Sequence, residues 1–177
     1  YAILCRGGVM GNAQTMNLLE MIIDALYGRG FNVLAHLGAF AVYVTGTMLT
    51  VLLPALWGVN MRRLSPVITA AAAVTECFLP ADMAVVVALY PIFFAMSIQW
   101  SSFSGAQGFV SSTIFSTNNT KQASLAFAEF ITDGDRGHFK KVQFYVLTLL
   151  AFHFGAAVSF FAVRLMGVRG AWVNIIL

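Results

Sequence analysis

A chain of 177 residues that is 59% hydrophobic and only 10% charged has too little polar surface for a water-soluble domain, in which about a quarter of the residues are charged. Its net charge of +3 comes from basic residues scattered between apolar runs, so the charge pattern argues against nucleic acid as a partner and favours the lipid bilayer. Cys5 and Cys77 lack a C-x-x-C spacing, and we expect no disulfide framework, metal site or cofactor.

The chain begins with a short apolar run, residues 1–5, which we expect to be the end of a membrane span whose first part lies upstream. After a glycine-containing break, the apolar periodicity of residues 17–27 predicts an amphipathic helix. Asn17, Glu20 and Asp24 share its polar face.

Four later segments are predicted to cross the bilayer, because each is an apolar run bounded by polar or turn residues. They are residues 31–57, the shorter alanine-rich segment 67–79, residues 83–100 with a kink at Pro91, and residues 142–163. Ser65 and Pro66 are expected to cap and open the second segment. The apolar run 171–177 is expected to be the start of a truncated span.

These elements predict an all-α polytopic membrane protein with about six spans, as two three-helix repeats over residues 1–79 and 80–177. An odd number of spans per repeat inserts the second repeat upside down, as in inverted-repeat transporters with broken helices. The basic residues then divide between the two sides, with the larger group facing the cytoplasm. That group is Arg62, Arg63, Lys121, Arg136, Lys140 and Lys141, and the other is Arg6, Arg29, Arg164 and Arg169.

A polar motif opens a helical segment in each predicted repeat: Thr15-Met16-Asn17, and again Thr117-Asn118-Asn119. Glu20 and Gln122 follow each Asn by three residues, which fits a helix capping box. The other interpretation is that paired helix N-termini, positive through their dipoles, face a polar or anionic ligand. The ligand-binding candidates on that interpretation are Gln14, Thr15, Asn17, Thr117 and Asn119, with Gln99 and His153 as supporting polar groups.

One carboxylate and two histidines lie inside the predicted spans. Glu76 is the only acidic one, and it is either an ion or proton site or an interfacial carboxylate that reaches water near Pro80. His36 and His153 share an H-x-G-A context. Each is either a buried neutral histidine bonded to a neighbouring helix or, for His153 at mid-span, a proton relay.

The segment Arg6-Gly7-Gly8-Val9-Met10-Gly11-Asn12-Ala13-Gln14-Thr15-Met16-Asn17 resembles the signature R-G-G-V-F-x-N-A-Q-T-G-N of the YoaK family of multi-span bacterial membrane proteins of unknown function. Gln99-Trp100-Ser101-Ser102-Phe103 and Thr117-Asn118-Asn119 are similar to that family's later Q-x-x-x-F and T-G-N elements. The family's glycine in T-G-N is Met16 in one copy and Asn118 in the other. The resemblance covers nearly the whole chain and implies a further span upstream, but it implies no specific activity.

The sequence therefore predicts a multi-pass protein of the bacterial plasma (inner) membrane, a small transporter-like permease for a small polar or anionic solute. The alternative is a non-transporting assembly protein or a protein that binds lipid or a partner. We expect no enzymatic activity, because no nucleophile, phosphate loop or zinc spacing is present. The expected partners are the lipid bilayer, the solute and further copies of the chain.

Overall fold

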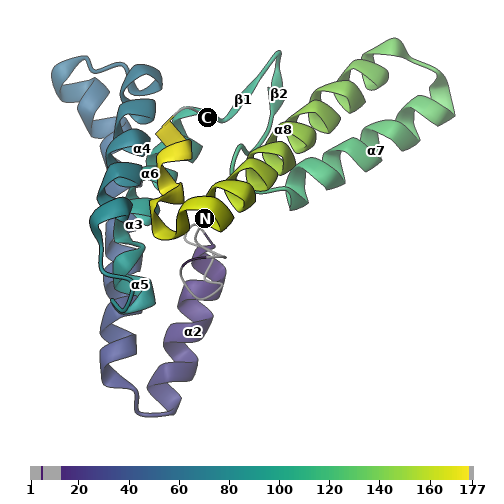
Figure 1. The fold of residues 1–177 in the computed structure, drawn as a ribbon. Helices are drawn as coiled ribbons and strands as arrows, with labels where there is room; N and C mark the ends of the chain where they lie inside the picture. The colour runs from purple at the N-terminus through teal and green to yellow at the C-terminus, as the bar shows by residue number, and fades with distance from the viewer. Residues whose placement is uncertain (1–4, 6–12, 176–177) are drawn as a thin grey trace. The chain divides into compact units, whose positions relative to one another are not determined.

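The computed structural model describes residue 5 and residues 13–175, and most of these residues lie in helices (Figure 1). The α-helices are α2 (Gln14–Leu26), α3 (Gly30–Trp57), α4 (Met61–Phe78), α5 (Val85–Ala88), α6 (Tyr90–Ser102), α7 (Thr117–Asp133) and α8 (Arg136–Met166). A 3-10 helix, η1 (Gly167–Ile175), follows α8, and strands β1 (Gly105–Ala106) and β2 (Phe109–Val110) form an antiparallel hairpin before α7. Apart from this small hairpin, the all-α prediction is confirmed for the described residues.

The chain folds into two compact units. Residues Tyr1–Ser102 and Val158–Leu177 form unit 1, and residues Phe103–Ala157 form unit 2. The predicted repeat boundary after residue 79 and the inverted arrangement of the repeats stay predictions.

Two segments of the described chain are long and apolar enough to cross a membrane: Gly30–Trp57, which is α3, and Arg136–Val173, which is α8 with most of η1. Only 11% of each apolar window is buried inside the protein. The core helix of a soluble domain would be mostly buried, so this low burial fits contact with lipid. Among the described residues, the predicted spans 67–79 and 83–100 lack this support by length and composition. The span end predicted at residues 1–5 lies almost entirely outside the described residues.

Several predicted boundaries were wrong. The second span begins at Met61, because the Asn60 side chain caps the helix by accepting from the Arg63 N–H at 3.3 Å. Ser65 therefore lies inside α4 and caps nothing. The third predicted span is divided into α5 and α6, and the described part of the last apolar run forms η1, which packs on α4.

Small residues set the packing of α3 in unit 1. A side chain at Gly38 would collide with the Tyr90 hydroxyl, and one at Gly46 would collide with the Ser97 hydroxyl of α6. The Tyr90 hydroxyl also donates to the Ala35 carbonyl at 2.8 Å. Close approach of helix backbones through small residues is typical of helix pairs in membranes. Beside this contact, Ala39, Leu89 and Phe93 form a buried apolar cluster.

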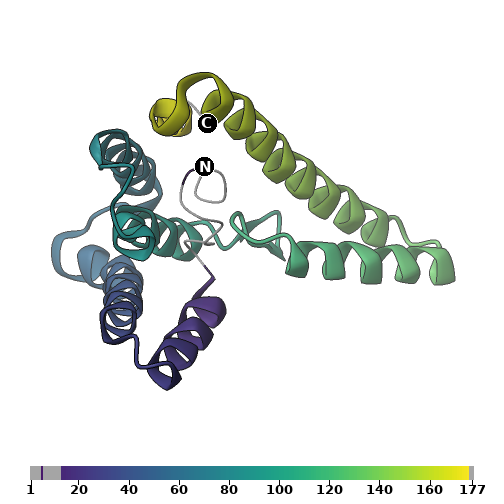
Figure 2. The same ribbon diagram turned by 60° about the horizontal axis from the view of Figure 1, so that its bottom comes forward.

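Unit 2 consists of the β-hairpin, α7 and the first part of α8. The hairpin turns at Gln107 and Gly108, both with positive φ, as two-residue hairpin turns require. The Tyr145 hydroxyl of α8 donates to the Val110 carbonyl at 2.7 Å and anchors the hairpin. The α7 and α8 helices contact each other near their turn at Gly134 and diverge from it (Figure 2).

Candidate functional site

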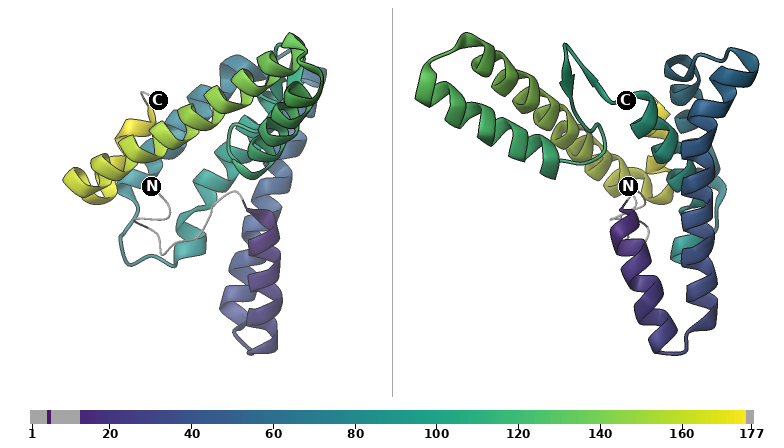
Figure 3. Two further views of the ribbon diagram at one scale, coloured as in Figure 1. Left: turned by 90° about the vertical axis from the view of Figure 1, so that its right-hand side faces the viewer. Right: turned by 180° about the vertical axis from the view of Figure 1, so that it is seen from behind.

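The helix α2 packs against α3 as a helical hairpin within unit 1 (Figure 3). Its polarity is reversed from that of a soluble surface helix. The residues of α2 that are buried are Asn17 and Asp24. Its large apolar side chains point outward and are between 48% and 83% exposed; they are Met16, Leu19, Ile22, Ile23 and Leu26. A helix with its apolar face outward and its polar face inward is stable in lipid, where apolar surface costs nothing and polar groups need internal partners.

Asn17 binds His36 of α3 through both ends of its carboxamide. Its Oδ1 lies 2.8 Å from the His36 ring Nδ1, and its Nδ2 donates to the His36 carbonyl oxygen at 3.0 Å. Nδ2 also donates to the Gln14 Oε1 at 3.2 Å. Asn17 and His36 are each only 4% exposed, so this pairing occupies the interior of the hairpin.

These contacts define where the protons are. Two acceptor oxygens, from His36 and Gln14, face one end of the Asn17 amide, so that end is the donating NH₂ group and the other end is the accepting oxygen. The His36 Nδ1 facing that oxygen must then carry a proton and donate it. In a neutral ring with its proton on Nδ1, Nε2 has none.

The other ring nitrogen faces acidic side chains. The His36 Nε2 lies 3.5 Å from Asp24 Oδ2 and 4.0 Å from Glu20 Oε2. Arg29 reaches the second Asp24 oxygen, Oδ1, at 3.2 Å. An unprotonated Nε2 beside a carboxylate would place two lone pairs opposite each other. A hydrogen bond across this gap would need a proton on Nε2 or on the carboxyl group of Asp24.

We call Asn17, Glu20, Asp24, Arg29 and His36 the polar cluster. Asp24 is 6% exposed, whereas the Arg29 side chain is 59% exposed at the mouth of the hairpin. His36 stands six residues after the start of α3, about 9 Å along its axis. Buried carboxylates inside a membrane protein are costly and are retained mainly where they bind or relay an ion. Chemically, this arrangement can hold one proton between an imidazole and a carboxylate.

The capping interpretation of the two motifs was wrong. The residue that caps α2 is Ala13 and the one that caps α7 is Ser116, and neither helix has a side-chain cap bond. Asn119 lies inside α7, where its Oδ1 accepts from the Ser112 N–H at 3.1 Å and its Nδ2 donates to the Ser112 carbonyl at 2.6 Å. In both motifs, the side-chain amide of the asparagine makes hydrogen bonds to residues outside its helix and does not cap the N–H groups at the start of that helix.

The predicted ligand residues are only partly brought together. Gln14 adjoins the polar cluster, and its Nε2 is buried with no hydrogen-bond partner among the described residues. Thr15 and Thr117 are exposed, and Asn119 is buried against its own loop. Their ligand-binding role stays a prediction.

The supporting residues lie elsewhere. Gln99 is half-buried in α6. Glu76 is fully buried in α4, which contradicts its interpretation as an interfacial carboxylate reaching water. His153 is exposed on α8 and contacts the Leu149 carbonyl of its own helix at 2.7 Å. The roles of Glu76 as an ion or proton site and of His153 as a relay stay predictions.

Sequence reasoning did not select Asp24 and His36 as site residues. The signal was present, because Asn17, Glu20 and Asp24 recur along one face of an otherwise apolar helix. A three-residue turn follows that helix, and a histidine stands in the second turn of the next apolar helix. Among the described residues, no group of three His, Cys, Asp or Glu side chains could hold a metal ion.

Comparison with known proteins identifies a family. A family model described as "Protein of unknown function (DUF1275)" matches residues 1–177. The YoaK resemblance is consistent with that family. No curated protein and no solved structure matches the chain. Because the family model covers every residue, the chain belongs to the DUF1275 family, and its apolar helices fit a membrane protein.

Proposed function

We propose that the protein is a small multi-pass permease of the bacterial inner membrane that moves a small polar or anionic solute and is not an enzyme. In this proposal about six spans form two inverted repeats that alternate access to the two sides. The observation that supports it best is the reversed polarity of α2. Its buried Asn17 and Asp24 and its exposed apolar side chains suit a helix that borders lipid on one face and a polar interior on the other.

The polar cluster would couple the solute to a proton. Asn17 keeps the proton of the neutral His36 ring on Nδ1, so Nε2 is the position that can gain or lose one. Asp24 lies 3.5 Å from Nε2 and can take the same proton. Of the two Asp24 carboxylate oxygens, the Arg29 guanidinium binds Oδ1, and Oδ2 is the one beside the ring. A proton could then pass between the carboxylate and the imidazole during one transport cycle.

The alternative function is a non-transporting protein that assembles with, or binds, a lipid or protein partner. In that case the Asn17–His36 pair would only pin α2 to α3. Buried hydrogen-bond networks commonly have such a structural role. The two functions differ in the expected effect of removing the charge of Asp24 by a substitution that preserves the fold. The loss of charge should impair a proton-coupled permease, and it should not affect a purely structural pair.

The test is solute uptake by full-length protein reconstituted in vesicles, over a panel of small polar and anionic solutes, with and without an inward proton gradient. We expect uptake of at least one solute to be driven by the gradient. Asp24→Asn should abolish the effect of the gradient, because the amide keeps the shape but cannot exchange a proton. His36→Gln should do the same.

The matched control is Asp82→Asn, the same substitution at an exposed position in the loop after α4. It should leave gradient-driven uptake unchanged. Unchanged proton coupling in folded Asp24→Asn and His36→Gln proteins would remove the cluster from the mechanism. Absence of uptake for every solute would favour the lipid- or partner-binding function.

A further inference from the structure

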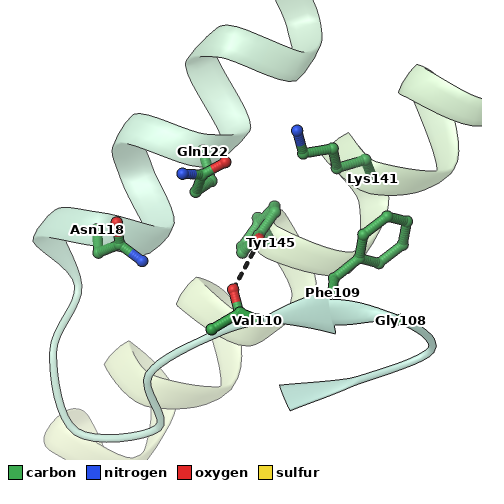
Figure 4. Close-up of a pocket in the computed structure, with 7 residues that line it drawn as sticks. All are labelled: Gly108, Phe109, Val110, Asn118, Gln122, Lys141 and Tyr145. Atoms are coloured by element: carbon green, nitrogen blue, oxygen red, sulfur yellow. Dashed lines mark hydrogen bonds between the residues drawn. The ribbon is translucent and has the colours of Figure 1, made fainter. Parts of the chain in front are cut away.

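A second polar site lies wholly within unit 2, where α7 and α8 diverge from their turn. An open pocket of about 370 Å³ is lined there by Gly108, Phe109, Val110, Asn118, Gln122, Lys141 and Tyr145 (Figure 4). None of these residues belongs to the polar cluster of α2 and α3. We propose that this pocket binds a small anion with an apolar body, such as an aromatic carboxylate or the headgroup of an anionic lipid.

The charge of the pocket favours an anion. Lys141 is the one charged residue among the lining residues, and its side chain is 26% exposed. Its Nζ lies 3.9 Å from the Glu129 Oε2, which is the outer limit of an ion pair. Since Glu129 itself is about half exposed to water, it screens the lysine weakly. An anion in the pocket would give the ammonium a closer partner.

The uncharged polar groups suit the same ligand. Asn118 and Gln122 stand one helical turn apart on α7, and their amides face the space that Lys141 also enters (Figure 4). Asn118 lies in the first turn of α7, where the helix dipole adds partial positive charge. The amide NH₂ groups can donate to carboxylate or phosphate oxygens.

One wall of the pocket is apolar and rigid. The Phe109 ring packs against the rings of Phe144 and Tyr145, with centroids 5.4 and 6.3 Å away. The Tyr145 hydroxyl is fixed by its bond to the Val110 carbonyl. A ligand that combines a negative group with an apolar or aromatic body would therefore meet a complementary surface on both sides.

The location suits a ligand that arrives from water or from the lipid headgroups. Lys141 stands five residues after the start of α8, about 8 Å along a helix that is a candidate span. That places the pocket near a polar end of the helix rather than at its middle. The site requires no transport, so it would exist equally in a permease and in a non-transporting protein.

The experiment uses the full-length protein in phosphatidylcholine nanodiscs and saturation-transfer NMR with two probes, benzoate and its neutral counterpart benzamide. We expect benzoate to bind and benzamide to bind much more weakly. Lys141→Met should weaken benzoate binding by roughly tenfold, because it removes one charge-assisted hydrogen bond. The matched control is Lys140→Met, which removes the same charge from the neighbouring exposed residue and should change binding by less than about twofold.

A second variant distinguishes a loss of binding from a folding defect. Asn118→Asp puts a negative charge into the pocket at an exposed position and should weaken benzoate binding with unchanged thermal stability.

Adding phosphatidylglycerol to the nanodiscs distinguishes the ligand sources. Displacement of benzoate would identify an anionic lipid headgroup, and retention would identify a soluble anion. Equal binding of benzoate and benzamide, or benzoate binding that both Lys141→Met and Asn118→Asp leave intact, would overturn the proposal.

Discussion

The side chain of Asn17 holds His36 at two points at once, with Oδ1 2.8 Å from the ring Nδ1 and Nδ2 donating to the backbone carbonyl at 3.0 Å. The pair joins a residue of the repeated polar motif to a residue of the first long apolar helix. Because the backbone contact fixes which end of the amide faces the ring, it also fixes the proton on Nδ1. Nε2 is thereby left facing Asp24.

Asn119 should be sensitive to a substitution that a helix cap would tolerate. Its amide donates to the carbonyls of Ser112 and Phe115 and accepts from the Ser112 N–H. Asn119→Asp removes both donated bonds and places a carboxylate against two carbonyl oxygens, so we expect a loss of about 1–3 kcal/mol in the free energy of unfolding. The measurement is thermal unfolding in detergent.

The neighbouring residue supplies the comparison for this prediction. The Asn118 side chain is exposed and makes no hydrogen bond to the loop among the described residues, so Asn118→Asp should change the free energy of unfolding by less than about 0.5 kcal/mol. If Asn119→Asp proves as harmless as Asn118→Asp, Asn119 does not hold the loop before α7.

Gly46 should not accept even one methyl group. A Cβ atom there would collide with the Ser97 hydroxyl and lie 3.1 Å from the Phe94 carbonyl oxygen of α6. Gly46→Ala should therefore force α3 from α6 and destabilise unit 1 by about 1–3 kcal/mol. Chemical denaturation followed by tryptophan fluorescence would measure the change.

Gly155 gives the opposite expectation for the same substitution. Nothing lies within 4 Å of a Cβ atom built at Gly155, which also stands inside a helix. Gly155→Ala should stabilise the protein by about 0.5–1 kcal/mol through helix propensity. Equal effects at Gly46 and Gly155 would mean that α3 and α6 do not pack closely in the membrane.

The topology prediction concerns the inverted repeats. If the second repeat is inserted upside down, Arg62 and Lys140 lie on the cytoplasmic side and Asp82 lies opposite. Cysteine substitutions at the three positions, each labelled with an impermeant reagent in intact cells and in inverted vesicles, would measure the sides. Labelling of Arg62→Cys and Lys140→Cys from opposite sides would exclude the inverted arrangement.

The sequence was sufficient to predict the helical class and the first long apolar helix, because residues 31–57 form an uninterrupted apolar run and α3 covers Gly30–Trp57. It was also sufficient to place Asn17, Glu20 and Asp24 on one helix face. It did not predict the β-hairpin, whose turn needs positive φ at Gln107. Glutamine carries no local signal for that conformation, and two-residue strands are too short for a periodicity.

The candidate site was harder to predict for a different reason. A local pattern predicts a local bond, so Asn17 and Asn119 were assigned as possible caps. Their actual partners, His36 nineteen residues later and Ser112 seven residues earlier, depend on how the chain folds back. Which face of α2 turns inward is likewise decided by the surrounding solvent, because lipid reverses the preference that water imposes. The periodicity of the sequence alone therefore does not predict which face of α2 is buried.

The two contacts of Asn17 with His36 imply that the neutral ring carries its proton on Nδ1 and leaves Nε2 beside Asp24. The most direct test is ¹⁵N NMR of histidine-labelled full-length protein in lipid bilayers, with the His36 signals assigned by their loss in His36→Gln. We expect the neutral His36 ring to carry its proton on Nδ1 and none on Nε2. A neutral His36 ring with its proton on Nε2 and none on Nδ1 would contradict this assignment.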